Sequence, residues 1–188
     1  MNRFVAALVL VAMSFAMADR MFAEDYVLDD QHTSVVFAIN HFGYSFCYGM
    51  FGRYGGEFSY DPASPADAKF SFTIDAASLD TKSEKRDEHL RGPDFFNVNQ
   101  FPEIKFVSTS VVEDGETINV TGDLTLHGVT KSITLPMAYM GSGPAPDGKT
   151  HLGFSGRAVF NRSDFDMTTY LPKIGDEVTL LISFEGIR

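Results

Sequence analysis

Residues 117–135 read TINVTGDLTLHGVTKSITL, and their side chains alternate between apolar and polar. One face of the first half carries four apolar side chains, those of Ile118, Val120, Leu124 and Leu126. A period of two is typical of half-buried antiparallel strands. His127-Gly128 interrupts the alternation with a polar residue followed by glycine, the pair that a tight hairpin needs for positive φ. The stretch therefore predicts two strands joined by a hairpin.

The same alternation continues on both sides. Asp114-Gly115 marks a second tight turn, so residues 101–139 are predicted to form a three-stranded meander. Further strands are expected near Val35–Asn40, Gly52–Tyr60, Lys69–Asp75, 152–160 and 178–184. The total is about eight strands, which close as a barrel or pack as a sandwich. A closed barrel has no exposed edges, and about eight strands leave room inside for one small ligand.

One segment breaks the alternation and predicts a short capped helix over Lys82–Arg91. Thr81 and Glu84 have the spacing of a capping box, in which each side chain binds a free backbone N–H. Gly92 stands where a left-handed residue ends a helix, and Pro93 forbids continuation. Asp87 and Arg91 are four positions apart, the spacing of a favourable ion pair.

This helix holds the densest cluster of titratable residues: Arg86, Asp87, Glu88, His89 and Arg91. Neighbouring helix positions point about 100° apart, so Asp87 and Glu88 do not face each other. His89 has Lys85 and Arg86 beside it, which offer no carboxylate to orient an imidazole base. The cluster is therefore predicted to be a solvated face and not a catalytic centre.

The other chemical motifs also favour structural interpretations. GPAPDGKT (Gly143–Thr150) fits the P-loop pattern, but two prolines remove N–H donors and a strand follows it, so a hairpin loop is expected. The five histidines show no metal-ligand spacing, although a site built from distant strands stays open. Cys47 is the single cysteine, so no internal disulfide forms, and a buried apolar role is expected. No catalytic residue and no metal site is predicted.

The first residues are interpreted as an export signal. Arg3 precedes the apolar run Phe4–Phe15, and cleavage is expected after Ala18, with Ala23 as the alternative. The run is too short to span a bilayer, so no stable membrane anchor is expected. Residues 19–188 then form a single domain, placed in the periplasm or secreted.

Charge and aromatic content limit the partners. A net charge of −10 makes nucleic acid an unfavourable partner, because phosphate contacts need clustered Lys and Arg. The chain has 18 phenylalanines and no tryptophan. These rings either fill a core or leave a hydrophobic tunnel that accepts a hydrocarbon chain.

Several ordered blocks resemble the YceI-like family of exported lipid- and polyisoprenoid-binding proteins. The most diagnostic is SLDTKSEKRDEHLRGPDFFNVNQFPEIKF (Ser78–Phe106). The others are Ile39–Pro62, Thr121–Leu135, 152–167 and 178–186. The resemblance spans about Tyr26–Gly186, with a soft departure at the long loop Gly141–Lys149.

The resemblance implies an extended, eight-stranded, antiparallel lipocalin-like barrel. Its tunnel would hold a long-chain isoprenoid or fatty lipid, such as a polyisoprenoid quinone or a fatty acid or amide. Binding, transport or storage without catalysis and without a cofactor is implied, as is a possible homodimer. The alternatives are an enzyme acting on a lipid through a site formed by separate strands, and a haem- or pigment-binding barrel.

Candidate ligand-binding residues follow from the inward faces of the predicted strands. The expected tunnel wall comprises Phe37, Ile39, Phe58, Phe70, Phe72, Phe106, Val120, Leu124, Phe154 and Phe184. Polar groups expected at the mouth are His41, Tyr44 and Arg53. Selectivity is expected to depend on tunnel depth and on these mouth residues.

Overall fold

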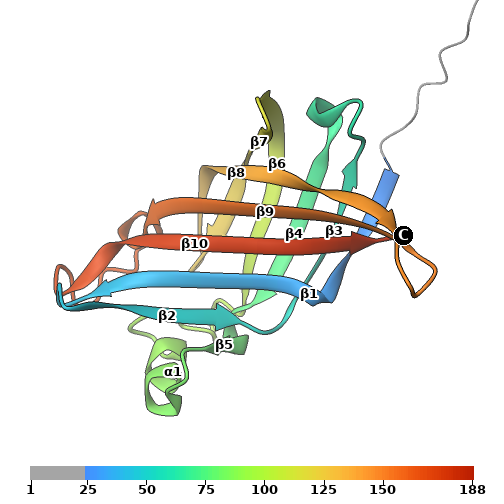
Figure 1. Cartoon of the computed structure of the whole chain (residues 1–188). Coiled ribbons are helices and arrows are strands. Elements are labelled where there is room, and N and C mark those ends of the chain that lie inside the picture. Colours follow the sequence, from blue (N-terminus) through green and yellow to red (C-terminus); the bar gives the residue numbers. More distant parts are fainter. Residues whose placement is uncertain (1–23) are drawn as a thin grey trace, which may run out of the picture.

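A computed structural model describes residues 24–188 of the chain (Figure 1). The expected signal segment, with both cleavage positions, lies outside these residues. The strands are β1 (Glu24–His41), β2 (Ser45–Phe51), β3 (Tyr54–Tyr60), β4 (Lys69–Asp75), β5 (Leu79–Asp80), β6 (Glu103–Asp114), β7 (Thr117–Leu126), β8 (Val129–Pro144), β9 (Thr150–Asn161) and β10 (Ile174–Ile187). The helices are α1 (Glu84–Arg91) and the 3-10 turns η1 (Pro65–Asp67), η2 (Ala76–Ser78) and η3 (Arg162–Phe165). Among the described residues, no helix is long and apolar enough to cross a membrane.

Eight strands form a closed antiparallel barrel. The order is β10-β9-β8-β7-β6-β4-β3-β1, and β1 pairs with β10 to complete the ring. The remaining two strands lie beside it: β2 pairs with the second half of β1, and β5 adds a two-residue bridge to β2. The predicted eight-stranded barrel is confirmed, with β2 and β5 in addition.

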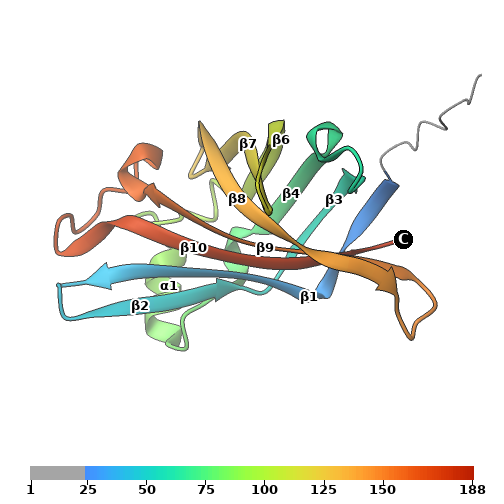
Figure 2. The ribbon, with the colours of Figure 1, turned by 45° about the horizontal axis from the view of Figure 1, so that its top comes forward.

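One edge of β1 is shared by two strands. Glu24–Val27 pair with β3, whereas Val35–His41 pair with β2. The wall therefore forks where β2 and β3 diverge, and α1 lies on the side of the molecule that carries β2 and β5 (Figures 1 and 2). In both views the β1–β2 hairpin and the start of β10 project together beyond the other strands.

The meander of β6, β7 and β8 is confirmed together with its turns. His127 and Gly128 have φ of 52° and 78°, the left-handed backbone that a tight hairpin requires. Gly115 has φ of 64° in the preceding turn. The GPAPDGKT segment is a hairpin, as predicted, but the loop is shorter than Gly141–Lys149 because β8 continues to Pro144.

Helix α1 is shorter than expected and capped differently. It begins at Glu84 after Ser83, and no side chain caps that end. Gly92 has φ of −72° and is not left-handed. Asp87 is buried and accepts hydrogen bonds from the backbone N–H and the hydroxyl of Thr81, at 2.9 and 2.5 Å. The predicted capping box was wrong because Thr81 binds Asp87 one turn further along.

Arg91 has a different partner from the one the spacing suggested. Its guanidinium donates to the carbonyl oxygens of Ala77 and Leu79, at 2.9 and 2.7 Å. Asp87 and Arg91 therefore both tie α1 to the segment before it. Leu90, the only apolar side chain of the helix, adds a hydrophobic contact with the core.

One end of the barrel interior is filled by aromatic rings. Stacked and edge-to-face pairs, with centroids 4.9–5.9 Å apart, join the rings of Tyr26, Phe58, Tyr60, Phe70 and Phe154, which we call the aromatic plug. Gly186 lies against it, and a Cβ there would meet the Phe58 ring at 2.4 Å. The plug therefore fills this end of the interior with packed rings.

Candidate ligand-binding cavity

Beyond the aromatic plug the barrel is hollow. A cavity of about 410 Å³ lies there, within the range of small-molecule sites. Its wall is almost entirely apolar. Strand residues in the wall include Val35, Phe37, Ile39, Phe72, Ile74, Ile104, Phe106, Leu124, Leu126, Ile133, Leu135, Met137, Phe160, Val178, Leu180, Ile182 and Phe184.

Strand register explains why these side chains converge. Phe37 pairs with Leu180 and Ile39 pairs with Val178 across the β1–β10 seam. Directly opposed residues in antiparallel strands project to the same face of the sheet. The alternate positions Leu181 and Val159 are exposed on the outside of the barrel. Period two thus places one apolar row of each strand in the cavity.

The cavity opens where β1 ends and β10 begins. His41, which pairs with Ile174, lies in the wall together with Phe42 and Tyr170. Phe42 is 45% exposed and Tyr170 is 55% exposed, so both touch cavity and solvent. We call His41, Phe42 and Tyr170 the aromatic rim of the opening.

Helix α1 contributes one of the polar parts of the wall. Arg86, His89 and Leu90 line the cavity, together with Thr81. Arg86 donates to the hydroxyl and carbonyl oxygens of Thr81, both at 2.6 Å. Arg86, Glu88 and His89 are exposed, as expected for a solvated face. Asp87 is buried, however, and one side of α1 also borders the cavity, which the sequence did not predict.

His89 also has a partner that the sequence did not indicate. Its Nε2 lies 3.0 Å from Oδ2 of Asp94, which follows the helix. Its ring meets Phe95 edge-to-face and lies near Tyr170. The rim thus carries an imidazole–carboxylate pair beside two aromatic rings.

Arg162 lies in the wall but turns its donors away from the cavity. Its guanidinium donates to the carbonyl oxygens of Met167, Thr169, Ile174 and Gly175. Burial lowers the pKa of this guanidinium from its usual value. Arg162 therefore fastens the loop after η3 to the start of β10.

The predicted site residues separate into three groups. Seven line the cavity: Phe37, Ile39, His41, Phe72, Phe106, Leu124 and Phe184. Four are buried core residues outside its wall, namely Phe58, Phe70, Val120 and Phe154. Tyr44 is 88% exposed at the β1–β2 turn, and Arg53 pairs with Asp75 on the surface. Tyr44 and Arg53 therefore do not form the mouth.

Cys47 is half-buried and lines the cavity. Its Sγ lies 3.9 Å from Nη1 of Arg86. Its neighbours Phe46 and Tyr48 are exposed on the opposite face of β2. Cys47 was expected to be buried and is only half-buried, because β2 covers the interior with one face only.

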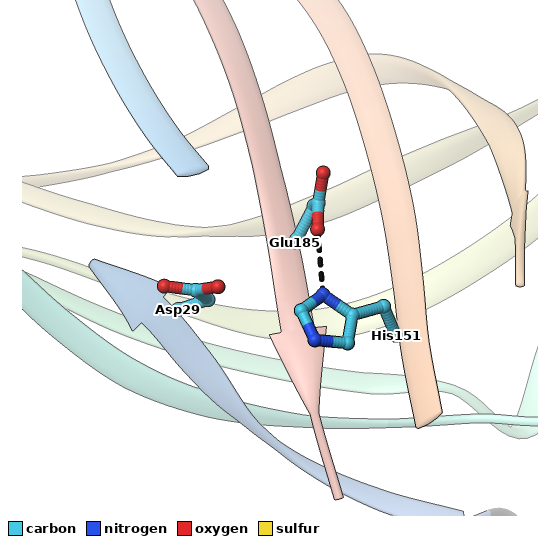
Figure 3. Close-up of side chains that lie close together, drawn as sticks. All are labelled: Asp29, His151 and Glu185. Carbon is cyan, nitrogen blue, oxygen red and sulfur yellow. Dashed lines mark hydrogen bonds and ion pairs between the residues drawn. The ribbon is translucent and has the colours of Figure 1, made fainter. Parts of the chain in front are cut away.

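A second polar group lies on the outside of the barrel. Asp29, His151 and Glu185 come from β1, β9 and β10 and bring three ligand-type atoms within 4.8 Å of one another (Figure 3). Hydrogen bonds to Glu185 and Asp147 raise the pKa of His151. A hydrogen bond from His32 lowers the pKa of Asp29, and the same bond raises the pKa of His32.

These features define the chain as a small antiparallel β-barrel that is plugged at one end and has an apolar cavity with an aromatic opening at the other. Residues 26–186 match the YceI-like domain, and the chain belongs to that family, as the sequence predicted. It is 40% identical over 190 residues to Protein YceI of Shigella flexneri, covering 100% of this chain and 99% of the relative.

Solved structures share the fold. Burkholderia cenocepacia BcnA superposes with a TM-score of 0.78 at 25% identity, covering 84% of this chain and 98% of that one. A polyisoprenoid binding domain from Saccharophagus degradans, implicated in plant cell wall breakdown, has a TM-score of 0.67 at 15% identity, covering 86% and 97%.

Proposed function

We propose that the protein binds a long-chain isoprenoid or related amphiphilic lipid in this cavity, and carries or stores it in the periplasm without catalysis. The observation that carries the proposal is the apolar cavity itself, closed by the aromatic plug and open at the rim. The name of the Saccharophagus domain agrees with such a ligand, although at 15% identity that likeness supports the fold alone.

Physical chemistry favours a hydrocarbon tail as the ligand. Burial yields about 0.8 kcal/mol per CH₂, so each five-carbon unit contributes roughly 4 kcal/mol before costs. A few units therefore offset the cost of association. The tail need not be long to bind tightly, so chain length is expected to be limited by the distance from the rim to the plug.

The polar wall on the α1 side suits a head group. Thr81, Arg86 and His89 are the polar residues there, and the Arg86 guanidinium is held in place by Thr81. A cation beside an apolar cavity favours an amphiphile with an anionic or hydrogen-bond-accepting head. We place the head group at these residues and the tail between β1, β10 and β7.

The residues that line the cavity favour binding without catalysis. Among the cavity-lining residues of the described chain there is no carboxylate, because the Asp94 carboxylate that pairs with His89 lies outside the wall. The group beside the Cys47 thiol is Arg86. A lipid hydrolase or isomerase would need a pair of acid–base groups at the reacting atoms. Catalysis is therefore not part of the proposal.

The proposal is tested by purifying the protein from its native host without detergent and analysing an organic extract by lipid mass spectrometry. One dominant isoprenoid or fatty species at near-equal molar amount is the expected result. A protein that is empty, and stays empty when offered such lipids, would overturn the proposal. An absorbance spectrum of the same preparation distinguishes a haem or pigment ligand.

Two cavity variants and one matched control sharpen the test. Phe72→Asp places a charge in the wall, and Leu180→Trp fills space there without a charge. Both should lose the extracted lipid, whereas Phe46→Asp, on the exposed outer face of β2, should keep it. Leu180→Trp keeps the interior apolar, so its fold can be checked by circular dichroism. Loss of lipid with an unchanged spectrum would show that the lipid occupies the cavity and that the loss is not caused by misfolding.

A further inference from the structure

We propose that Asp29, His151 and Glu185 form a binding site for a divalent transition-metal cation such as Zn²⁺ on the outer surface of the barrel. The three residues lie on adjacent strands, because β10 pairs with β1 on one side and with β9 on the other (Figure 3). One imidazole and two carboxylates are ligands that zinc accepts in proteins.

The spacing of the ligand atoms fits a cation without rearrangement of the strands. Nδ1 of His151 lies 2.8 Å from Oε2 of Glu185, and Asp29 completes a group whose ligand atoms lie within 4.8 Å of one another. Bond lengths of about 2.0–2.1 Å place tetrahedral zinc ligands roughly 3.3 Å apart. Small side-chain rotations bring this set to that distance.

His151 and Asp29 are each already oriented by hydrogen bonds to a further residue. Nε2 of His151 lies 3.2 Å from Oδ2 of Asp147, the carboxylate–imidazole arrangement that supports a metal bond at the other ring nitrogen. Asp29 accepts hydrogen bonds from Nδ1 of His32 at 2.7 Å and from the backbone N–H of Gln31 at 2.9 Å. An outer shell of this kind fixes ligand direction and raises ligand basicity.

Burial and charge distinguish the cluster from an ordinary surface ion pair. The side chains of Asp29 and His151 are only 12% and 19% exposed to solvent. Asp29, Asp147 and Glu185 bring three negative charges to two imidazoles. A divalent cation offsets two of these three charges.

The site is separate from the lipid cavity. Phe184 is buried in the interior, so the next residue, Glu185, projects to the outer face. Leu152 is buried as well, so its neighbour His151 also projects to the outer face. The cation would clamp β1, β9 and β10 together across the closing seam of the barrel. Its role would then be structural, and independent of whether a lipid is bound.

The experiment is a calorimetric titration of the chelator-treated full protein with Zn²⁺, comparing wild type with His151→Ala, Glu185→Gln and His32→Ala. One equivalent should bind to wild type. His151→Ala and Glu185→Gln should each weaken binding at least tenfold, and His32→Ala should do so by about 10-fold, as expected for an outer-shell partner. Asp94→Asn is the matched control, since Asp94 belongs to an exposed histidine–carboxylate pair elsewhere and does not line the lipid cavity.

Three outcomes would overturn the site. The first is no saturable binding to wild type. The second is unchanged affinity in His151→Ala and Glu185→Gln, and the third is an equal loss of affinity in Asp94→Asn. Glu185→Gln keeps the size and hydrogen bonding of the side chain, and its melting curve without metal shows whether the barrel is intact. Histidine NMR signals give a second readout, because only His151 and His32 should shift with the first equivalent.

Discussion

Phe154 is the central ring of the aromatic plug, and its side chain is 0% exposed. It packs against Phe58, Tyr60 and Phe70. Phe154→Ala should lower the free energy of unfolding by about 3–5 kcal/mol, because it leaves a cavity in a well-packed region. Urea denaturation measures the change. The control Phe46→Ala, at a site that is 57% exposed, should change stability by less than about 0.5 kcal/mol. Equal effects of the two substitutions would contradict this account of the plug.

The ion pair of Arg53 and Asp75 predicts a pH dependence. Arg53 donates from Nε and Nη2 to Oδ2 of Asp75, and this bond lowers the pKa of Asp75 from 3.8. A lowered carboxyl pKa adds stability that is complete above the unfolded value and is lost as pH falls through the folded value. Arg53→Met should therefore cost about 0.5 kcal/mol at pH 7, as for an exposed pair.

The cost of Arg53→Met should shrink as the pH drops below 3.8, the ordinary value for Asp75. Denaturation curves at several pH values measure it. In an Asp75→Asn background the loss of Arg53 should have no such pH dependence. A cost that stays constant from pH 7 to pH 3 would argue against the pair.

Residue patterns could predict which side chains face the barrel interior, but not which of these line the cavity and which pack in the core. Phe37 and Phe58 belong to strands with the same alternation, yet Phe37 lines the cavity and Phe58 belongs to the plug. The difference arises from contacts between strands far apart in sequence, such as Phe58 with Phe154. The cluster of Asp29, His151 and Glu185 was invisible for the same reason, since its members come from β1, β9 and β10.

Among the elements, α1 depends on one buried carboxylate. Asp87→Ala would leave the N–H and hydroxyl of Thr81 without their acceptor, at a cost of about 1–3 kcal/mol for each group left unsatisfied. Because the contact is local, amide hydrogen exchange should accelerate over residues 81–92 while β7 and β8 stay protected. Glu88→Ala, on the exposed side of α1, should leave exchange unchanged. Acceleration throughout the barrel would show that α1 is not a separately anchored element.

Strands could be predicted from the sequence where one face is polar and the other apolar, because their residues then alternate. The β6–β7–β8 meander satisfies that condition, and its turns carry glycine at positive φ. Strand β2 was missed because Phe46, Tyr48 and Met50 are apolar and exposed, so both of its faces appear apolar. Strand β1 was predicted too short, since its register shifts between Asp29 and Ser34 and interrupts the alternation.

At the scale of the whole molecule, the hollow half of the barrel predicts a ligand-dependent stability. A lipid that binds only the folded chain stabilises it by about 2.7 kcal/mol at one hundred times its Kd. For a chain of this length, that raises Tm by about 5–10 °C. Differential scanning calorimetry of delipidated and reloaded protein measures the shift. Leu180→Trp should reduce the shift, and an equal shift in that variant would place the lipid outside the cavity.

The closure of the barrel between β1 and β10 has a consequence for synthesis. The seam joins the first described strand to the last, from Val27 with Ile187 to His41 with Ile174. A nascent chain cannot complete its wall until β10 has been synthesised. Until then both margins of the unfinished sheet are open to chaperones, and a chain truncated before Ile174 is permanently left in that state.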